Sequence, residues 1–306
     1  MVKSLTKKEK EFKMKHIEKH PMIMIVIGVI GISLSSIFVK YSTAPSAVTA
    51  AFRLLWTVVF MTPAVFASST VRREFFTTPA RLVILSTLSG IFLAVHFVLW
   101  FDSLNHTSVA SSTTIVCTEV IWVALGFCLF LKGKLVWKAI AAIGVTLAGS
   151  ILIAWSDSAG GMLYGDLLAL LAAIAVAVYT LLGRVVRETV STTVYTYMVY
   201  TSCAAVLVIS CIAQNAPLFG YGLSPVIVGL LLALFSTILG HSIFSWCLKY
   251  FSPAFVSASK LCEPVVAGIL AAFLFGELPG ALQLMGSILI LGGVWYYSRL
   301  EIRSEQ

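Results

Sequence analysis

The sequence predicts an all-α membrane protein with ten transmembrane helices, arranged as two inverted repeats of five helices each. Three observations support this fold class. The 306 residues are 59% hydrophobic and only 11% charged, with a mean hydropathy of +0.98, whereas soluble domains are about 25% charged. Apolar segments of about 20 residues, the length that crosses a bilayer, recur along the whole chain. The two halves of the chain also come into register at one fixed offset.

The apolar segments are separated by short stretches that contain Pro, Gly and charged residues. Each segment is expected to be a helix, because a chain inside a bilayer must satisfy its backbone N–H and C=O groups within itself. The expected spans are residues 22–40, 46–67, 80–103, 108–131, 136–156, 163–183, 192–213, 224–248, 254–275 and 280–298.

The basic residues predict the orientation of these spans. With the N-terminus inside, 18 of the 21 Lys and Arg residues fall on the inner side, seven of them within the first 19 positions. Lys40 is on the outer side, and Arg53 and Lys260 lie within spans. This bias follows the positive-inside rule. It explains the net charge of +8 through membrane orientation, and nucleic acid is therefore not expected as a partner.

The ends of the chain are expected to be cytoplasmic, and the protein to be a multi-pass protein of the cell membrane. Residues 1–21 form a basic arm, which we expect to be retained because no small-residue cleavage site follows a short apolar region. Residues 299–306 form a cytoplasmic tail. All six cysteines lie in apolar segments, where they are expected to pack as small residues rather than form disulfides or a metal site.

An internal repeat appears when the sequence is shifted by 144 positions. Glu119 then aligns with Glu263, and Gly149 with Gly293. The two repeats are expected at residues 22–156 and 163–298. Because each has five spans, the second enters the membrane from the opposite side. Inverted repeats of this kind are typical of secondary transporters, with the substrate site near the midplane.

Local motifs resemble a known family. The segment "AFRLLW", which contains Arg53, and the segment "SPAFVSASKLCEPVVAGILAAFLFGELPG" at 252–280 resemble the EamA type of the drug/metabolite transporter superfamily. The resemblance covers nearly all of residues 22–298. It implies alternating access for a small metabolite, often for export. The first half departs from the family pattern at "LKGKLVW" (131–137), where the family commonly repeats Gly-Glu.

Four charged residues lie inside the expected spans: Arg53, Glu119, Lys260 and Glu263. A charge near the centre of a membrane helix costs about 2.5–3.5 kcal/mol, so the four would cost on the order of 10 kcal/mol facing lipid. They must therefore face a cavity, pair with one another or, for the acids, be protonated. Two acids at equivalent positions of the two repeats favour one shared central compartment.

Glu119 lies on a predicted polar face of the fourth span, where helical spacing places it with Ser112 and Trp122. This face is suited to line a substrate cavity, and the alternative is a hydrogen bond that holds a neighbouring helix. Glu263 is a candidate for ligand or proton chemistry, or for an internal ion pair with Lys260 three residues away. Pro264 lacks an N–H and is expected to kink the ninth span.

Arg53 and two histidines have open roles. Arg53 can bind a carboxylate bidentately, or it can pair or snorkel for structural reasons. His96 and His241 lie within spans 3 and 8 and can relay protons, or serve as buried packing residues.

Several aromatic residues are also candidates for substrate binding. Trp122, Tyr179 and Tyr197 are deep enough to stack on a ring or cation, or simply to pack. Trp100 and Trp246, near span ends, are expected to be interface anchors.

The sequence predicts a secondary transporter and not an enzyme, since it shows no catalytic motif and no soluble domain for a cofactor. The expected substrate is a small metabolite such as an amino acid, with export as the expected direction. The alternative is an exchanger of anionic or phosphorylated metabolites that uses Lys260 and Arg53. The expected partners are the lipid bilayer, a small-molecule substrate and protons as a candidate coupling ion, with no cofactor. The chain is expected to be a monomer or a homodimer.

Overall fold

The computed structural model describes residues 21–39, 41–107, 112, 115–156, 163–263, 265–266, 269–270, 273 and 280–304. Every regular element within these residues is a helix, and no strand occurs among them. Pro264, where a kink was predicted, lies outside the described residues.

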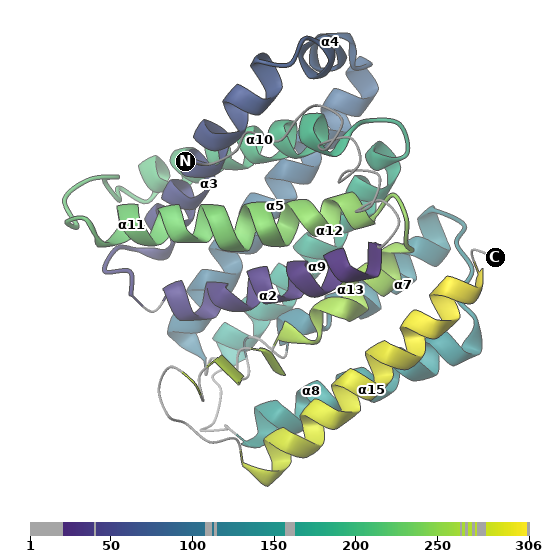
Figure 1. The fold of residues 1–306 in the computed structure, drawn as a ribbon. Helices are drawn as coiled ribbons and strands as arrows, with labels where there is room; N and C mark the ends of the chain where they lie inside the picture. Colours follow the sequence, from purple (N-terminus) through teal and green to yellow (C-terminus); the bar gives the residue numbers. More distant parts are fainter. Residues whose placement is uncertain are drawn as a thin grey trace, which may run out of the picture.

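The first half of the chain contributes six described helices (Figure 1). They are α2 (Pro21–Val39), α3 (Ser46–Phe66), α4 (Ser69–Thr77), α5 (Ala80–His106), α7 (Glu119–Phe130) and α8 (Trp137–Ser156). The short helix α4 lies in the connection between the second and third expected spans. It begins because the Ser68 hydroxyl accepts a hydrogen bond from the backbone N–H of Val71, which satisfies one of the unpaired donors at a helix N-terminus.

The second half begins with two long helices and continues with shorter ones. They are α9 (Leu163–Arg187), α10 (Thr192–Ala213), α11 (Ser224–Leu231), the π-helix η1 (Leu232–His241), α12 (Ser242–Cys247), α13 (Pro253–Lys260) and α15 (Ala281–Ser304). The elements α11, η1 and α12 follow one another without a break and together form one span, Ser224–Cys247.

Seven of the described helices are long and apolar enough to cross a membrane. Two shorter apolar helices cover Ile115–Phe130 and Trp137–Leu152. The protein is therefore a multi-pass, all-helical membrane protein, although the described residues do not reach the predicted count of ten spans. The fourth and ninth expected spans, 108–131 and 254–275, both run over residues outside the described set.

Helices from the two halves of the chain are interleaved. One buried core joins α3 and α5 from the first half with α9 and α10 from the second. A second core joins α2, α7 and α8 with α12, α13 and α15. Figure 1 shows α8 and α15 side by side at one edge of the bundle. Each half therefore lacks a closed core of its own, and their interface runs through the middle of the protein.

Candidate functional site

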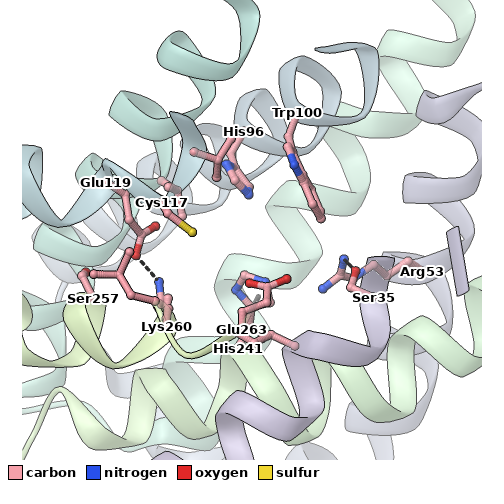
Figure 2. Close-up of a pocket in the computed structure, with 14 residues that line it drawn as sticks. Ser35, Arg53, His96, Trp100, Cys117, Glu119, His241, Ser257, Lys260 and Glu263 are labelled. Carbon is pink, nitrogen blue, oxygen red and sulfur yellow. Dashed lines mark hydrogen bonds and ion pairs between the residues drawn. The ribbon is translucent and has the colours of Figure 1, made fainter. Parts of the chain in front are cut away.

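A cavity of about 60 Å³, measured as the volume open to the centres of water-sized molecules, lies between helices of the two halves. Its lining is rich in charged and polar side chains, shown in Figure 2. The lining residues are Ile32, Ser35, Arg53, His96, Trp100, Val116, Cys117, Glu119, Val176, His241, Ser257, Lys260, Leu261 and Glu263. Such a compartment at a repeat interface is where transporters of this architecture hold their substrates.

An ion pair joins the two halves at one end of the cavity. The Nζ atom of Lys260 lies 2.8 Å from Oε1 of Glu119, and the two side chains are only 12% and 6% exposed. The ammonium also lies 5.6 Å from the ring centroid of Phe244, within the range of a cation–π contact. The hypothesis that Lys260 pairs with Glu263 is therefore wrong, because Lys260 pairs with the acid of the other repeat.

The helix geometry explains this choice of partner. Residues three apart face each other only along a continuous α-helix, and α13 ends at Lys260. A turn follows, in which the N–H of Leu261 bonds the carbonyl of Ala258 and the N–H of Cys262 bonds that of Ser259. This tighter turn changes the direction in which Glu263 projects.

The equivalent position of the first repeat has a similar interruption. The N–H of Thr118 bonds the carbonyl of Ile115 at 3.0 Å, three residues back, and α7 begins at Glu119. The polar face predicted for a continuous fourth span is therefore interrupted just before its acid. Breaks of this kind within spanning helices often mark functional sites.

Glu263 differs from Glu119 in having no partner among the described residues. No hydrogen bond or ion pair reaches its carboxylate there, although its backbone carbonyl accepts a bond of 3.4 Å from the Ser33 hydroxyl. Glu263 and His241 both line the cavity, as Figure 2 shows. Of these two acids, Glu119 is thus paired with a lysine, whereas the Glu263 carboxylate has no hydrogen-bond or ion-pair partner among the described residues.

Arg53 is almost completely buried, at 1% exposure, and is held in place from three directions. Its Nε donates to Oγ1 of Thr237 at 2.7 Å, and its Nη1 donates to the hydroxyl of Ser35 at 3.4 Å. The guanidinium carbon lies 4.4 Å from the ring centroid of Phe97. Its Nη2 has no hydrogen-bond partner within the part of the chain that the structure describes.

Both predicted histidines line the cavity. Nδ1 of His96 lies 3.0 Å from the carbonyl oxygen of Ala172. Since a carbonyl only accepts, a neutral His96 donates from Nδ1 and keeps its acceptor lone pair on Nε2. His241, at the end of η1, meets the rings of Phe97 and Tyr179 edge-on, with centroids 5.6 and 6.2 Å away.

Trp100 is the residue whose position the sequence analysis missed. It was predicted to be an interface anchor, which is wrong, because its side chain is only 7% exposed and lines the cavity. Its ring stacks on His96 with centroids 5.9 Å apart, and no described residue forms a hydrogen bond with its Nε1. The signal that could have found it is its spacing of four residues from His96, which places both on one helix face.

The other aromatic candidates lie outside the cavity lining. Tyr179 forms a 2.9 Å hydrogen bond with the Ser245 hydroxyl and contacts the ring of His241, which lines the cavity. Tyr197 bonds the Thr62 hydroxyl at 3.2 Å and packs among phenylalanines. Trp122 is half-buried, and its Nε1 has no hydrogen-bond partner in the described part of the chain.

Two small polar residues of the lining were not predicted. Ser35 lies on α2 and accepts a hydrogen bond from Arg53. Ser257 lies on α13, and its buried hydroxyl has no hydrogen-bond partner among the residues that the structure describes. Ser257 stands three residues before Lys260, so helical spacing alone could have placed it on the cavity face.

Comparisons with known proteins agree with this architecture. The sequence profile of the EamA-like transporter family matches residues 20–155 and 163–299. A protein of Clostridium kluyveri, described as an uncharacterised transporter, is 24% identical over 204 residues, which is 64% of this chain and 66% of the relative. The match thus spans just under two thirds of the relative's length.

A solved crystal structure of a protein has the same fold. It superimposes with a TM-score of 0.76, covering 94% of this chain and 99% of the other, at 17% sequence identity. At that identity the likeness describes the fold alone. With two family matches that together span nearly the whole chain, and apolar helices throughout, this protein belongs to the EamA-like transporter family of the drug/metabolite transporter superfamily, whose members are membrane transporters of small molecules.

Proposed function

We propose that this protein is a secondary active transporter that exports a small zwitterionic metabolite, such as an amino acid. The observation that supports the proposal is the cavity between the halves, where Arg53, Glu119, Lys260 and Glu263 meet. With all four ionised, these two acids and two bases sum to zero charge. A zwitterion also has no net charge, so its entry leaves no uncompensated charge in a medium where such a charge is costly.

The proposed mechanism is alternating access by rocking of two inverted five-helix repeats, residues 22–156 and 163–298, with ten spans in all. The ion pair between Lys260 and Glu119 joins one repeat to the other, and a contact of this kind can differ between the two states of a rocking transporter. We further propose that both termini are cytoplasmic, in the cell membrane, and that Glu263 with His241 can couple proton movement to transport.

The exchanger of phosphorylated metabolites has less support. That function needs Lys260 and Arg53 both available to a multiply charged anion. Lys260 is paired with Glu119 at 2.8 Å, so it is not free to bind such an anion. Glu263 faces the same cavity and would repel a dianion.

The experiment is counterflow of radiolabelled amino acids by purified protein in liposomes. The wild-type protein should exchange at least one amino acid, and Glu263→Gln should reduce the rate at least about tenfold, because a cavity charge that meets the substrate is worth more than 1.4 kcal/mol. Glu188→Gln is the matched control, since Glu188 is 61% exposed in its pair with Arg184 and lies away from the cavity.

Two results would contradict the proposal. One is the absence of counterflow for every amino acid. Exchange of sugar phosphates in the same assay would favour the exchanger of phosphorylated metabolites. The other is wild-type counterflow by Glu263→Gln, which would remove that residue from the site.

A further inference from the structure

Three side chains of the cavity lining carry hydrogen-bond donors that lack an acceptor among the described residues. Nη2 of Arg53, Nε1 of Trp100 and Oγ of Ser257 are all buried without a hydrogen-bond partner among the described residues. Their residues are 1%, 7% and 1% exposed. The large majority of buried polar atoms in proteins have a partner, so three exceptions around one cavity need an explanation.

The chemistry of these atoms restricts what can satisfy them. A guanidinium and an indole N–H can donate but cannot accept. The group that binds Arg53 and Trp100 must therefore be an acceptor, and beside a permanent cation an anionic oxygen is favoured. An ammonium group is excluded from this position, because it would bring more donors to a set that already lacks acceptors.

The donors are held in place before any ligand binds. Two other nitrogens of Arg53 bond Thr237 and Ser35, and the indole of Trp100 stacks on His96 with an interplanar angle of 14°. Figure 2 shows Arg53 and Trp100 on the side of the cavity away from Lys260. A prepositioned donor loses little conformational entropy on binding, which is what gives a site its affinity.

The remaining charges decide between a carboxylate and a larger anion. Lys260 is paired with Glu119, so it adds no net positive charge at the Arg53 side. The carboxylate of Glu263 has no partner among the described residues and faces the same cavity. The cavity thus offers one cation, Arg53, and one anion, Glu263, that are not paired with each other or with Lys260. This pair suits a ligand with one carboxylate and one ammonium group better than it suits a phosphate dianion.

We propose that Arg53 and Trp100 form the subsite that binds the substrate carboxylate, and that Glu263 accepts hydrogen bonds from the substrate ammonium. This inference rests on the proposed transport of an amino acid, and it assigns each end of that substrate to named atoms. Trp100 is then a residue that determines specificity, because its N–H rejects substrates without a carboxylate acceptor. A site built to hydrogen-bond a polar group discriminates strongly against analogues that lack it.

The experiment measures binding by thermal shift, as apparent Kd values for the purified full-length protein. The probes are leucine, methionine and phenylalanine, each with its amide, its decarboxylated amine and its deaminated acid. The amino acids should bind at least about tenfold more tightly than their amides and amines. Trp100→Phe, which keeps the ring but removes the N–H, should weaken amino-acid binding about tenfold and leave amine binding unchanged.

Trp246→Phe is the matched control, because Trp246 packs on Tyr250 outside the cavity lining. This variant should still bind amino acids more tightly than their amides and amines. Amides and amines that bind as tightly as the amino acids would overturn the carboxylate subsite and leave amino-acid transport standing. Tight binding of the deaminated acids alone would support the subsite and contradict the zwitterionic substrate. If Trp100→Phe weakened the binding of amino acids and of amines equally, the effect would be structural, and the proposed role of the Trp100 N–H would be overturned.

Discussion

Lys260 and Glu119 lie 2.8 Å apart, although 141 residues separate them and they belong to opposite halves of the chain. Removal of one partner leaves the other charge buried and unpaired, which typically costs about 3–5 kcal/mol. Glu119→Gln and Lys260→Gln should therefore each lower the stability of the protein, and the double variant should lose less than the sum of the two by about 1–3 kcal/mol. Thermal or chemical unfolding in detergent measures this coupling, and additive losses would show that the pair is not coupled.

Glu263→Gln should have a different profile from Glu119→Gln. Because no described residue bonds the Glu263 carboxylate, its neutralisation should change the free energy of unfolding by less than about 1 kcal/mol. Counterflow should nevertheless fall at least about tenfold, because the Glu263 carboxylate lines the cavity and is proposed to meet the substrate. A large loss of stability in Glu263→Gln would mean that its carboxylate has a structural partner.

Thr237 should be important for the position of Arg53. Thr237→Val removes the acceptor of the Arg53 Nε and leaves another buried donor unpaired, at a cost of about 1–3 kcal/mol. Thr237→Ser keeps the hydroxyl and should retain most of the stability and the substrate affinity. The melting temperature and the apparent Kd of both variants test this expectation. A Thr237→Val protein with the wild-type melting temperature and Kd would refute it.

Close packing of α5 on α10 should make Gly90 intolerant of a side chain. A Cβ atom at Gly90 would lie 1.9 Å from Oγ of Ser202 and 2.3 Å from the carbonyl oxygen of Val199, so Gly90→Ala should destabilise by about 1–3 kcal/mol. Gly144→Ala is the control. A Cβ there meets nothing within 4 Å, and alanine favours a helix by about 1 kcal/mol relative to glycine. Equal melting temperatures for the two variants would contradict the packing.

Part of the site could be predicted from the sequence because it depends on local composition and spacing. Charges inside apolar segments must face a cavity or a partner, and this argument selects Arg53, Glu119, Lys260 and Glu263 without coordinates. All four line the cavity, as do His96 and His241. The aromatic candidates were less predictable, since a deep tryptophan or tyrosine packs as readily as it lines a site.

The sequence by itself indicated the membrane class, because hydropathy is a property of the chain, and it predicted an internal repeat in which Glu119 corresponds to Glu263. Only the tertiary structure decided that Lys260 pairs with Glu119 and that Trp100 faces the cavity. The reason is physical: spacing along a helix identifies neighbours at three or four residues, and the turn after Lys260 breaks that rule. Partners on other helices are decided by packing between the two halves, which brings residues far apart in the chain within hydrogen-bond distance.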